Sequence, residues 1–349
     1  ILDLCREYPD IGIRISIEQC VSSLLIQTVE DIEILLVDDG SKDKSGEICD
    51  RFAREDARVR VLRQSNLGAA TARNAGLQAA RGEWICFVDS DDWAEPRMLE
   101  ILMAHADGAD ICVGDYFAET HEGSTRERFF GREGARYSHD EVVTLLTLCL
   151  FGTSYLGVDA STNLGVPWAR LYRREFLLGR NLRYKDGLKR MQDMVFNLGA
   201  LECAGAVVHV PAPVYHYRLN EIEAGERFRE DFPDTAAEAL SEIRRFLDDF
   251  YPDGKLEVLY HTKAVMLQLE CTRLLSVQTR PARTGLERIR AIQALDRAAR
   301  FRGEKKYVNR KLLTRRQRIG VMLLSLKLYT PLYLSYRLTY LSRRRKMFA

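Results

Sequence analysis

The chain has 349 residues, of which 46% are hydrophobic and 29% charged, so it can bury a sizeable core and is not disordered by default. Its eight cysteines are scattered without a Cys-x-x-Cys pair, which argues against a zinc site or a disulfide framework and favours reduced thiols in a cytosolic compartment. The formal net charge is only +2, but residues 300–349 hold fifteen Lys or Arg against one acid, Glu304, so the rest of the chain is net acidic.

The first 115 residues predict alternating strands and helices. A β-branched, apolar run at residues 32–37 stops at a turn, which is typical of a buried strand. We expect next a helix at 45–56, a strand at 59–62, a turn at 66–68 that leads into a helix through residue 80, a strand at 84–88, a helix at 96–105 and a strand at 111–114. This alternation with short connections predicts an α/β fold, in which an open, mainly parallel sheet has helices on both faces.

The rest of the chain has a different pattern. Residues 116–220 are mixed, with a helix-like piece at 192–201 and a strand-like piece at 206–210. From residue 221 onward the pattern is helical, with apolar residues at a spacing of three and four. We therefore expect three regions, which are residues 1–115, residues 116–220 and a helical C-terminal extension at residues 221–349.

Two acidic clusters follow predicted strands. Asp38 and Asp39 come after the first strand, and Asp89, Asp91 and Asp92 come after the third. Ligands bind outside the carboxyl ends of the strands in such sheets, so we expect both clusters in one crevice. Two carboxylates two residues apart can hold one Mg²⁺ or Mn²⁺, which would neutralise charge on a departing diphosphate. Acidic strand ends also cap helices, and Asp-Gly-Ser is ordinary turn chemistry, so each cluster has a simpler explanation.

Arg73 lies in a predicted helix of otherwise small residues. Small side chains permit close packing of a helix on a sheet, which is the simpler explanation of the helix. A guanidinium group in such a helix is suited to phosphate or carboxylate, so Arg73 is also a candidate ligand.

The order and spacing of these motifs resemble family 2 of the inverting glycosyltransferases, which have the fold called GT-A. The similarity extends over residues 17–218 and leaves the helical tail outside. The matching segments are VDDGS at 37–41, NLG at 66–68, ARNAG at 72–76, FVDSDD at 87–92, PWARLYRR at 167–174, QDMVF at 192–196 and PVYHYR at 213–218.

The resemblance implies a role for each matching residue. Residues 1–115 would be the nucleotide-sugar-binding half of the catalytic domain and residues 116–220 its acceptor-binding half. Asp193 would be the general base that takes the proton from the acceptor hydroxyl as it attacks the anomeric carbon, which gives inversion in one displacement. The donor site would comprise Pro9, Asp38, Asp39, Arg73 and Asp89, and the metal would be held by Asp91 and Asp89.

Three residues are weaker candidates for contacts with the acceptor or its sugar. Trp168 could stack on a sugar face, although a large aromatic residue at this position is equally typical of a core. His216 could join the metal or diphosphate site, although a structural histidine is the simpler interpretation. Asp92 completes the acidic cluster.

The start of the chain departs from the family pattern, in which a hydrophobic strand runs into Pro-x-Tyr-Asn. Pro9 matches the proline, but Ile11 and Gly12 stand where Tyr and Asn are expected, and the preceding residues 4–8 are charged where a central strand is normally buried. This departure puts the donor site in question. Two smaller departures are Gln192 for Glu and Arg170 for Lys.

The basic tail is predicted to bind a membrane surface. Residues 319–341 are largely apolar but broken by Lys327, Pro331 and Arg337, so no stretch approaches the roughly 20 residues of a spanning helix. Apolar residues with flanking cations are typical of a helix pair in an anionic membrane interface, and the alternative is a basic hairpin packed on the protein's own core. Nucleic acid is a rival partner, but no recognition module is present. Because no secretory signal is visible, we expect a cytoplasmic protein at the inner face of the cell membrane.

The leading hypothesis is a metal-dependent, inverting glycosyltransferase. It would move a sugar from a nucleotide diphosphate, with a leaning toward UDP, to a lipid-linked or polysaccharide acceptor in the synthesis of capsule, exopolysaccharide or lipopolysaccharide. One alternative is a degenerate, non-catalytic, membrane-bound relative, because of the altered start of the chain. Another is a nucleotidyltransferase, which can share an acidic metal edge on a related sheet.

Overall fold

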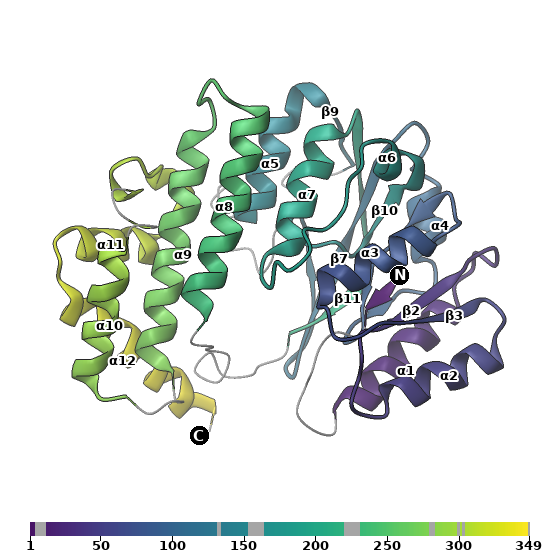
Figure 1. The fold of residues 1–349 in the computed structure, drawn as a ribbon, viewed down its shortest axis with the longest axis horizontal. Helices are drawn as coiled ribbons and strands as arrows, with labels where there is room; N and C mark the ends of the chain where they lie inside the picture. Colours follow the sequence, from purple (N-terminus) through teal and green to yellow (C-terminus); the bar gives the residue numbers. More distant parts are fainter. Residues whose placement is uncertain are drawn as a thin grey trace. The chain divides into compact units, whose positions relative to one another are not determined.

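The computed structural model describes residues 1–3, 12–130, 134–152, 164–219, 231–278, 283–298, 301 and 304–347. The chain divides into two compact units. The first unit comprises residues 1–153 and 159–220, and the second comprises residues 154–158 and 221–349. Figure 1 draws both units, coloured along the sequence.

The first unit begins with a parallel sheet of four strands, which lie in the order β3 (Val59–Arg63), β2 (Ile34–Asp38), β1 (Leu2–Asp3) and β5 (Val88–Asp89). All five residues of β2 are buried, as expected of an inner strand in a parallel sheet. The family pattern places a central strand at residues 4–8, which lie outside the described residues. Among the described strands, β1 lies between β2 and β5.

Helices cover both faces of this sheet, as predicted. The helices α1 (Gly12–Leu25) and α2 (Ser45–Glu55) contact each other, and α2 packs on β2 and β3. The helix α3 (Ala69–Ala79) packs on β1 and β2. Figure 1 shows α1 and α2 on one side of β2 and β3 and α3 on the other.

A second, mixed sheet completes the first unit. Its main path has the order β4, β10, β7, β11 and β6, with β8 paired to β7 and β9 paired to β11. Among the described strand pairs of this sheet, only the pair of β7 and β11 is parallel. The bounds are β4 (Trp84–Ile85), β6 (Trp93–Ala94), β7 (Ile111–Thr120), β8 (Gly123–Glu127), β9 (Arg136–Ser138), β10 (Arg170–Arg173) and β11 (Ala206–Arg218). The remaining helices of this unit are α4 (Met98–Met103), α5 (Val142–Phe151), α6 (Arg174–Gly179) and α7 (Gln192–Cys203).

Two strand predictions are corrected by this sheet. The single strand predicted at residues 84–88 is two strands, because β4 pairs in the mixed sheet and β5 pairs in the parallel sheet. The strand predicted at residues 111–114 continues to Thr120 as β7 and belongs to the mixed sheet. The chain therefore crosses between the two sheets immediately before the second acidic cluster.

Trp168 belongs to the aromatic core of the first unit. Its side chain is 1% exposed, and its ring stacks on Tyr215 and Tyr217 with centroid distances of 4.8 and 5.0 Å. Tyr116 and Phe129 pack against the same ring. The expectation that Trp168 stacks on a sugar is corrected, because a buried indole offers no free face, and the core interpretation holds.

The second unit is helical: its α-helices in the described residues are α8 (Phe232–Phe250), α9 (Glu257–Val277), α10 (Gly285–Arg297), α11 (Arg315–Ser325) and α12 (Tyr329–Met347). Two short 3-10 helices, at Glu304–Lys306 and Arg310–Leu312, lie between α10 and α11. Buried residues on α8 recur at a spacing of three and four, which gives it one core-facing side. Capping boxes begin α10 at Thr284 and Glu287 and α11 at Thr314 and Gln317, and they satisfy the first backbone N–H groups of each helix.

The basic tail forms a helical hairpin that packs on the core of its own unit. Val321 and Leu324 of α11 and Leu332 and Tyr336 of α12 join a cluster with residues of α9 and α10. The alternative of a hairpin packed on the protein's own core is therefore correct for this face of the two helices. No helix in the described parts of the chain is both long and apolar enough to cross a membrane.

If Trp168 is a core residue, Trp168→Ala should lower the free energy of unfolding by about 3–5 kcal/mol, because it removes a large, fully buried side chain. Urea denaturation of the two proteins measures this difference. Trp84→Ala is the matched control and should cost less, because Trp84 is only half-buried. A Trp168→Ala protein as stable as its parent would contradict the core assignment.

Candidate functional site

Both acidic clusters lie at one edge of the parallel sheet. Asp38 ends β2 and Asp39 follows it, while Asp89 ends β5, with β1 between these two parallel strands. Asp91 and Asp92 follow in the next turn, and all five carboxylate residues are buried, with exposures of 6% or less. The topology thus places the two predicted clusters at the carboxyl ends of two parallel strands that are separated by one strand, where such sheets bind ligands.

The first cluster organises the turns beside the sheet. The Asp38 carboxylate accepts a hydrogen bond from the Ser41 backbone N–H at 2.9 Å, which fixes the turn after β2. The Asp39 carboxylate accepts hydrogen bonds from the backbone N–H groups of Leu67 and Gly68 at 2.8 and 2.7 Å. Gly68 precedes α3 at a φ of 91°, a conformation that favours glycine. Asp39 therefore couples the turn after β2 to the start of the helix that carries Arg73.

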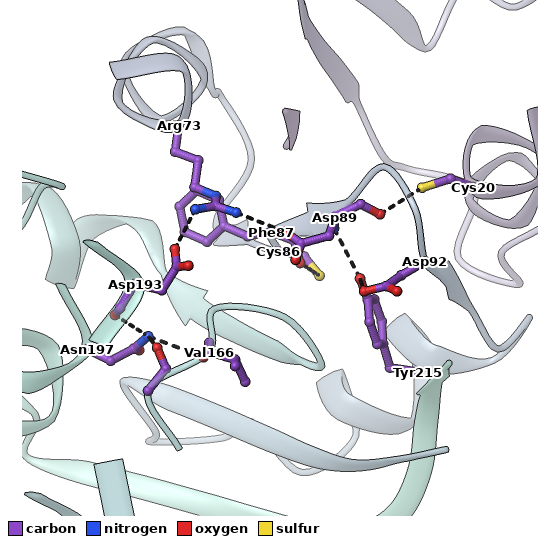
Figure 2. Close-up of polar contacts among 11 residues, drawn as sticks. Cys20, Arg73, Cys86, Phe87, Asp89, Asp92, Val166, Asp193, Asn197 and Tyr215 are labelled. Atoms are coloured by element: carbon purple, nitrogen blue, oxygen red, sulfur yellow. Dashed lines mark hydrogen bonds and ion pairs between the residues drawn. The ribbon is translucent and has the colours of Figure 1, made fainter. Parts of the chain in front are cut away.

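Arg73 joins three distant segments of the chain through its guanidinium group. Its side chain is 2% exposed, and Nη2 donates to Asp89 Oδ1 at 2.8 Å, while Nη1 donates to Asp193 Oδ1 (Figure 2). The guanidinium also lies over the ring of Tyr184, 5.4 Å from its centroid. Sequence reasoning identified Arg73, Asp89 and Asp193 separately, and the structure shows that they form one ion-paired group.

Asp193 lies in the first turn of α7, and its side chain is 24% exposed, which makes it more accessible than its arginine partner. One turn later, the amide of the fully buried Asn197 donates to the backbone carbonyls of Asp193, Gly165 and Val166 (Figure 2). The Asn197 Oδ1 atom accepts from the hydroxyl of Tyr172 at 2.7 Å. Asn197 therefore fixes the start of the helix that presents Asp193.

Sequence reasoning missed Asn197 as a supporting residue. The available signal was its position four residues after Asp193 in a predicted helix, which puts both side chains on one face. It also did not assign Asn74, whose side chain donates to the Tyr184 carbonyl and accepts from the Tyr184 N–H. That pair of bonds holds Tyr184 beside Arg73.

The second acidic cluster offers ligand atoms that suit a hard divalent cation. Carboxylate oxygens of Asp89, Asp91 and Asp92 all lie within 4.8 Å of one another. Burial raises the pKa of the neighbouring Cys20 thiol well above its usual range, and the negative charges of all three aspartates add to the effect. A strongly negative, oxygen-only environment fits Mg²⁺ or Mn²⁺.

Asp92 has a structural role in this cluster. The Tyr215 hydroxyl accepts from the Asp89 backbone N–H and donates to Asp92 Oδ2, both at 3.0 Å. The Arg218 backbone N–H donates to Asp92 Oδ1 at 2.8 Å. The two oxygens of Asp92 thus tie the cluster to β11, and its contact with the acceptor stays a prediction.

His216 is a structural histidine, which was the simpler of its two interpretations. Its ring is stacked on Trp93 and Phe117, and its Nδ1 and Nε2 atoms lie 2.7 and 2.6 Å from carboxylate oxygens of Glu119 and Glu95. Because both ring nitrogens are engaged, the predicted contribution of His216 to a metal or diphosphate site is corrected.

The structure describes only part of the two departures from the family pattern, at the start of the chain and at Arg170. Pro9 and Ile11 lie outside the described residues, and Gly12 begins α1. Arg170, which replaces a lysine of the pattern, is fully buried and donates to the carbonyl of Leu164 at 3.1 Å and to Asn197 Oδ1 at 3.3 Å. Arg170 thus supports the residue that holds the start of α7.

Comparisons with known proteins agree with this arrangement. A family model described as glycosyl transferase family 2 matches residues 16–177. EpsH of Bacillus subtilis strain 168 is 32% identical over 245 residues, which cover 69% of this chain and 67% of EpsH. The succinoglycan biosynthesis protein ExoO of Rhizobium meliloti strain 1021 is 30% identical over 251 residues, which cover 71% of this chain and 69% of ExoO.

Solved structures show the same fold. The structure of S. aureus TarS 1-349 in complex with UDP-GlcNAc superposes with a TM-score of 0.59 at 18% sequence identity, and covers 98% of this chain and 90% of that chain. The corresponding complex with UDP gives a TM-score of 0.57. At this level of identity the similarity concerns the fold.

The bridge between Arg73 and its two carboxylates makes a prediction about stability. Arg73→Met should lower the free energy of unfolding by about 3–5 kcal/mol, because it leaves Asp89 buried without its counter-charge. Adding Asp89→Asn removes that uncompensated charge, so the double variant should lose less than the sum of the two single losses. Urea denaturation of all four proteins gives the coupling energy.

The exposed pair of Arg97 and Glu100 provides the control cycle, with side-chain exposures of 65% and 42%. Its coupling energy should stay below about 1 kcal/mol, because exposed ion pairs are screened by water. If the stability losses of the Arg73 and Asp89 variants simply add in the double variant, the result would contradict an ion pair between the two side chains.

Proposed function

Because the chain belongs to glycosyl transferase family 2, we propose that it is an inverting glycosyltransferase that moves a sugar from a nucleotide diphosphate sugar, a UDP-sugar, to an acceptor hydroxyl. The acceptor is lipid-linked or part of a growing cell-surface polysaccharide, at the cytoplasmic face of the membrane. The observation that carries the proposal is the direct pairing of Arg73 with Asp193 and Asp89.

Asp193 is the general base in this proposal. Its carboxylate takes the proton from the acceptor hydroxyl as the acceptor oxygen attacks the anomeric carbon. The bond from that carbon to the diphosphate oxygen breaks in the same step, and its electron pair leaves with the nucleotide diphosphate. A base must be ionised and within hydrogen-bond reach of the proton, and Arg73 favours both by pairing with the charged carboxylate and fixing its direction.

The acidic edge serves the donor. Asp89 and Asp91 would hold Mg²⁺ or Mn²⁺, which neutralises charge on the leaving diphosphate when bound. Asp38 and Asp39 would contact the nucleotide from the end of β2, and Pro9 would line the same pocket from the preceding segment. UDP and UDP-GlcNAc bind TarS, which has this fold, and this supports a UDP-sugar as the donor.

The acceptor class is supported by the names of relatives. ExoO is a succinoglycan biosynthesis protein, and succinoglycan is a polysaccharide. The alignments span about two thirds of EpsH and ExoO. A transferase acting on surface polysaccharide is therefore favoured over a nucleotidyltransferase, for which residues 168–218 offer no support.

The base assignment predicts that Asp193→Asn lowers the transfer rate by about 10²–10⁴-fold and leaves UDP binding intact, because general-base catalysis contributes about this much. Transfer is measured with a panel of UDP-sugars and lipid-linked acceptors in the presence of Mn²⁺, and the anomeric configuration of the product by NMR. Inversion at the anomeric carbon is expected.

Glu175→Gln is the control, because it removes an exposed carboxylate from α6 in the same unit, and it should retain parental activity. Transfer by Asp193→Asn at the parental rate, or a product that keeps the donor configuration, would refute the mechanism. A parent protein that binds no donor and transfers no sugar would favour the non-catalytic alternative.

A further inference from the structure

The hairpin of α11 and α12 is apolar on two faces, and only one of them packs on the other described helices of the second unit. Seven large apolar side chains between residues 319 and 341 remain exposed, out of fifteen in the described residues of the whole chain. We call these seven the outer stripe. They are Ile319, Met322, Leu326, Leu328, Leu334, Leu338 and Leu341.

The outer stripe follows the helical repeat. Ile319 and Met322 of α11 and Leu326, the residue that caps its C-terminus, are three and four residues apart, with exposures of 46%, 49% and 60%. On α12, Leu334 and Leu338 are four residues apart, with exposures of 45% and 63%. Residues at these spacings share one side of a helix, opposite the side that joins the core, so each helix presents an apolar ridge.

The stripe lies in a segment with one sign of charge. Residues 305–349 contain thirteen Lys or Arg and no Asp or Glu. Arg315, Arg318 and Lys327 are exposed and lie within a few residues of the ridge on α11. A row of apolar side chains beside cations is complementary to a surface with an apolar interior and anionic groups.

An arginine pair between α10 and α12 adds to this charge. Arg288 is 5% exposed, and its guanidinium donates to the backbone carbonyls of Leu275 and Arg283 at 3.0 and 3.1 Å. Burial lowers the pKa of Arg288, and the nearby charge of Arg337 lowers it further. The Nη1 atom of Arg337 is buried and has no hydrogen-bond partner among the described residues. The second unit thus holds two positive charges close together beneath the hairpin, in addition to the exposed cations of α11.

Other partners fit the outer stripe less well. A second copy of this chain that paired hairpin to hairpin would bring an equally cationic surface, and like charges repel across an interface. Nucleic acid offers phosphates, but phosphate contacts use no apolar ridge. The interface of an anionic bilayer offers both apolar depth and negative charge.

We propose that the outer stripe lies in the interface of an anionic lipid bilayer, with the helices of the hairpin parallel to the membrane surface and their cations at the lipid phosphates. This inference deepens the proposed function and rests on it for one point, that the acceptor is lipid-linked. Docking through the second unit brings the enzyme to the surface where such an acceptor is found.

The test is flotation of the full chain with phosphatidylcholine vesicles, with and without phosphatidylglycerol. The parent should float with the anionic vesicles, and less so as salt is raised. The triple variant Ile319→Gln, Leu334→Gln and Leu338→Gln should bind at least about tenfold more weakly, because it removes apolar area that the interface buries. A second triple variant, Arg315→Gln, Arg318→Gln and Lys327→Gln, should lose about tenfold or more on anionic vesicles.

The matched control is Ile26→Gln, Met103→Gln and Leu178→Gln, which removes three apolar side chains of similar exposure from the first unit and should float like the parent. All variants should keep the thermal stabilisation that UDP and Mn²⁺ give the parent, which separates loss of membrane binding from loss of the donor site. If the parent floats with anionic vesicles but binds no UDP, the result would support the docking inference and contradict the proposed function.

Three results would overturn the docking inference. The first is a parent that stays unbound with anionic vesicles, and the second is equal flotation of the parent and the outer-stripe variant. The third is a dimer, seen by light scattering without vesicles, that the outer-stripe variant dissociates while the parent fails to float.

Discussion

The ion-paired guanidinium of Arg73 is the interaction on which the site depends. A buried arginine is costly unless its charge is compensated, and here Asp89, 16 residues away in the chain, and Asp193, 120 residues away, compensate it. The helix α3, the end of β5 and the start of α7 must therefore meet at one point. Asp39 holds the start of α3, and Asn197 holds the start of α7, so two further buried polar residues fix the members of this group.

Residues of both sheets contribute to this one site. The parallel sheet supplies the acidic edge, while β11 of the mixed sheet supplies Tyr215, which donates to Asp92 and accepts from the Asp89 backbone. Three carboxylates in a buried turn repel one another, and a hydroxyl, a backbone N–H and Arg73 offset part of that repulsion. The residual negative charge would attract a divalent cation, which in turn would attract the diphosphate of the donor.

The sequence was sufficient for the elements whose signals are local. Buried apolar runs that stop at acidic turns located β2 and β5, and small residues around Arg73 located α3. Pairing between sheets is a long-range property, so the division of residues 84–88 into β4 and β5 had no local signal. The roles of Trp168 and His216 could not be predicted from residue type either, because a Trp or a His can contact a ligand or pack in a core. The neighbouring rings and carboxylates, which the sequence does not reveal, distinguish the two roles. The tail was an analogous case: one face of the hairpin packs on the protein's own core, and binding of the other face to a membrane stays a prediction.

The most direct test of the account is thermal stabilisation of the parent and of Asp91→Ala by UDP, GDP, dTDP and CMP, with and without Mn²⁺. We predict that UDP stabilises the parent in a metal-dependent manner, by about 2.7 kcal/mol at a hundred times its dissociation constant, and that Asp91→Ala abolishes the effect. Stabilisation by none of the nucleotides, or equal stabilisation of the parent and Asp91→Ala, would contradict a metal-dependent donor site at this edge of the sheet.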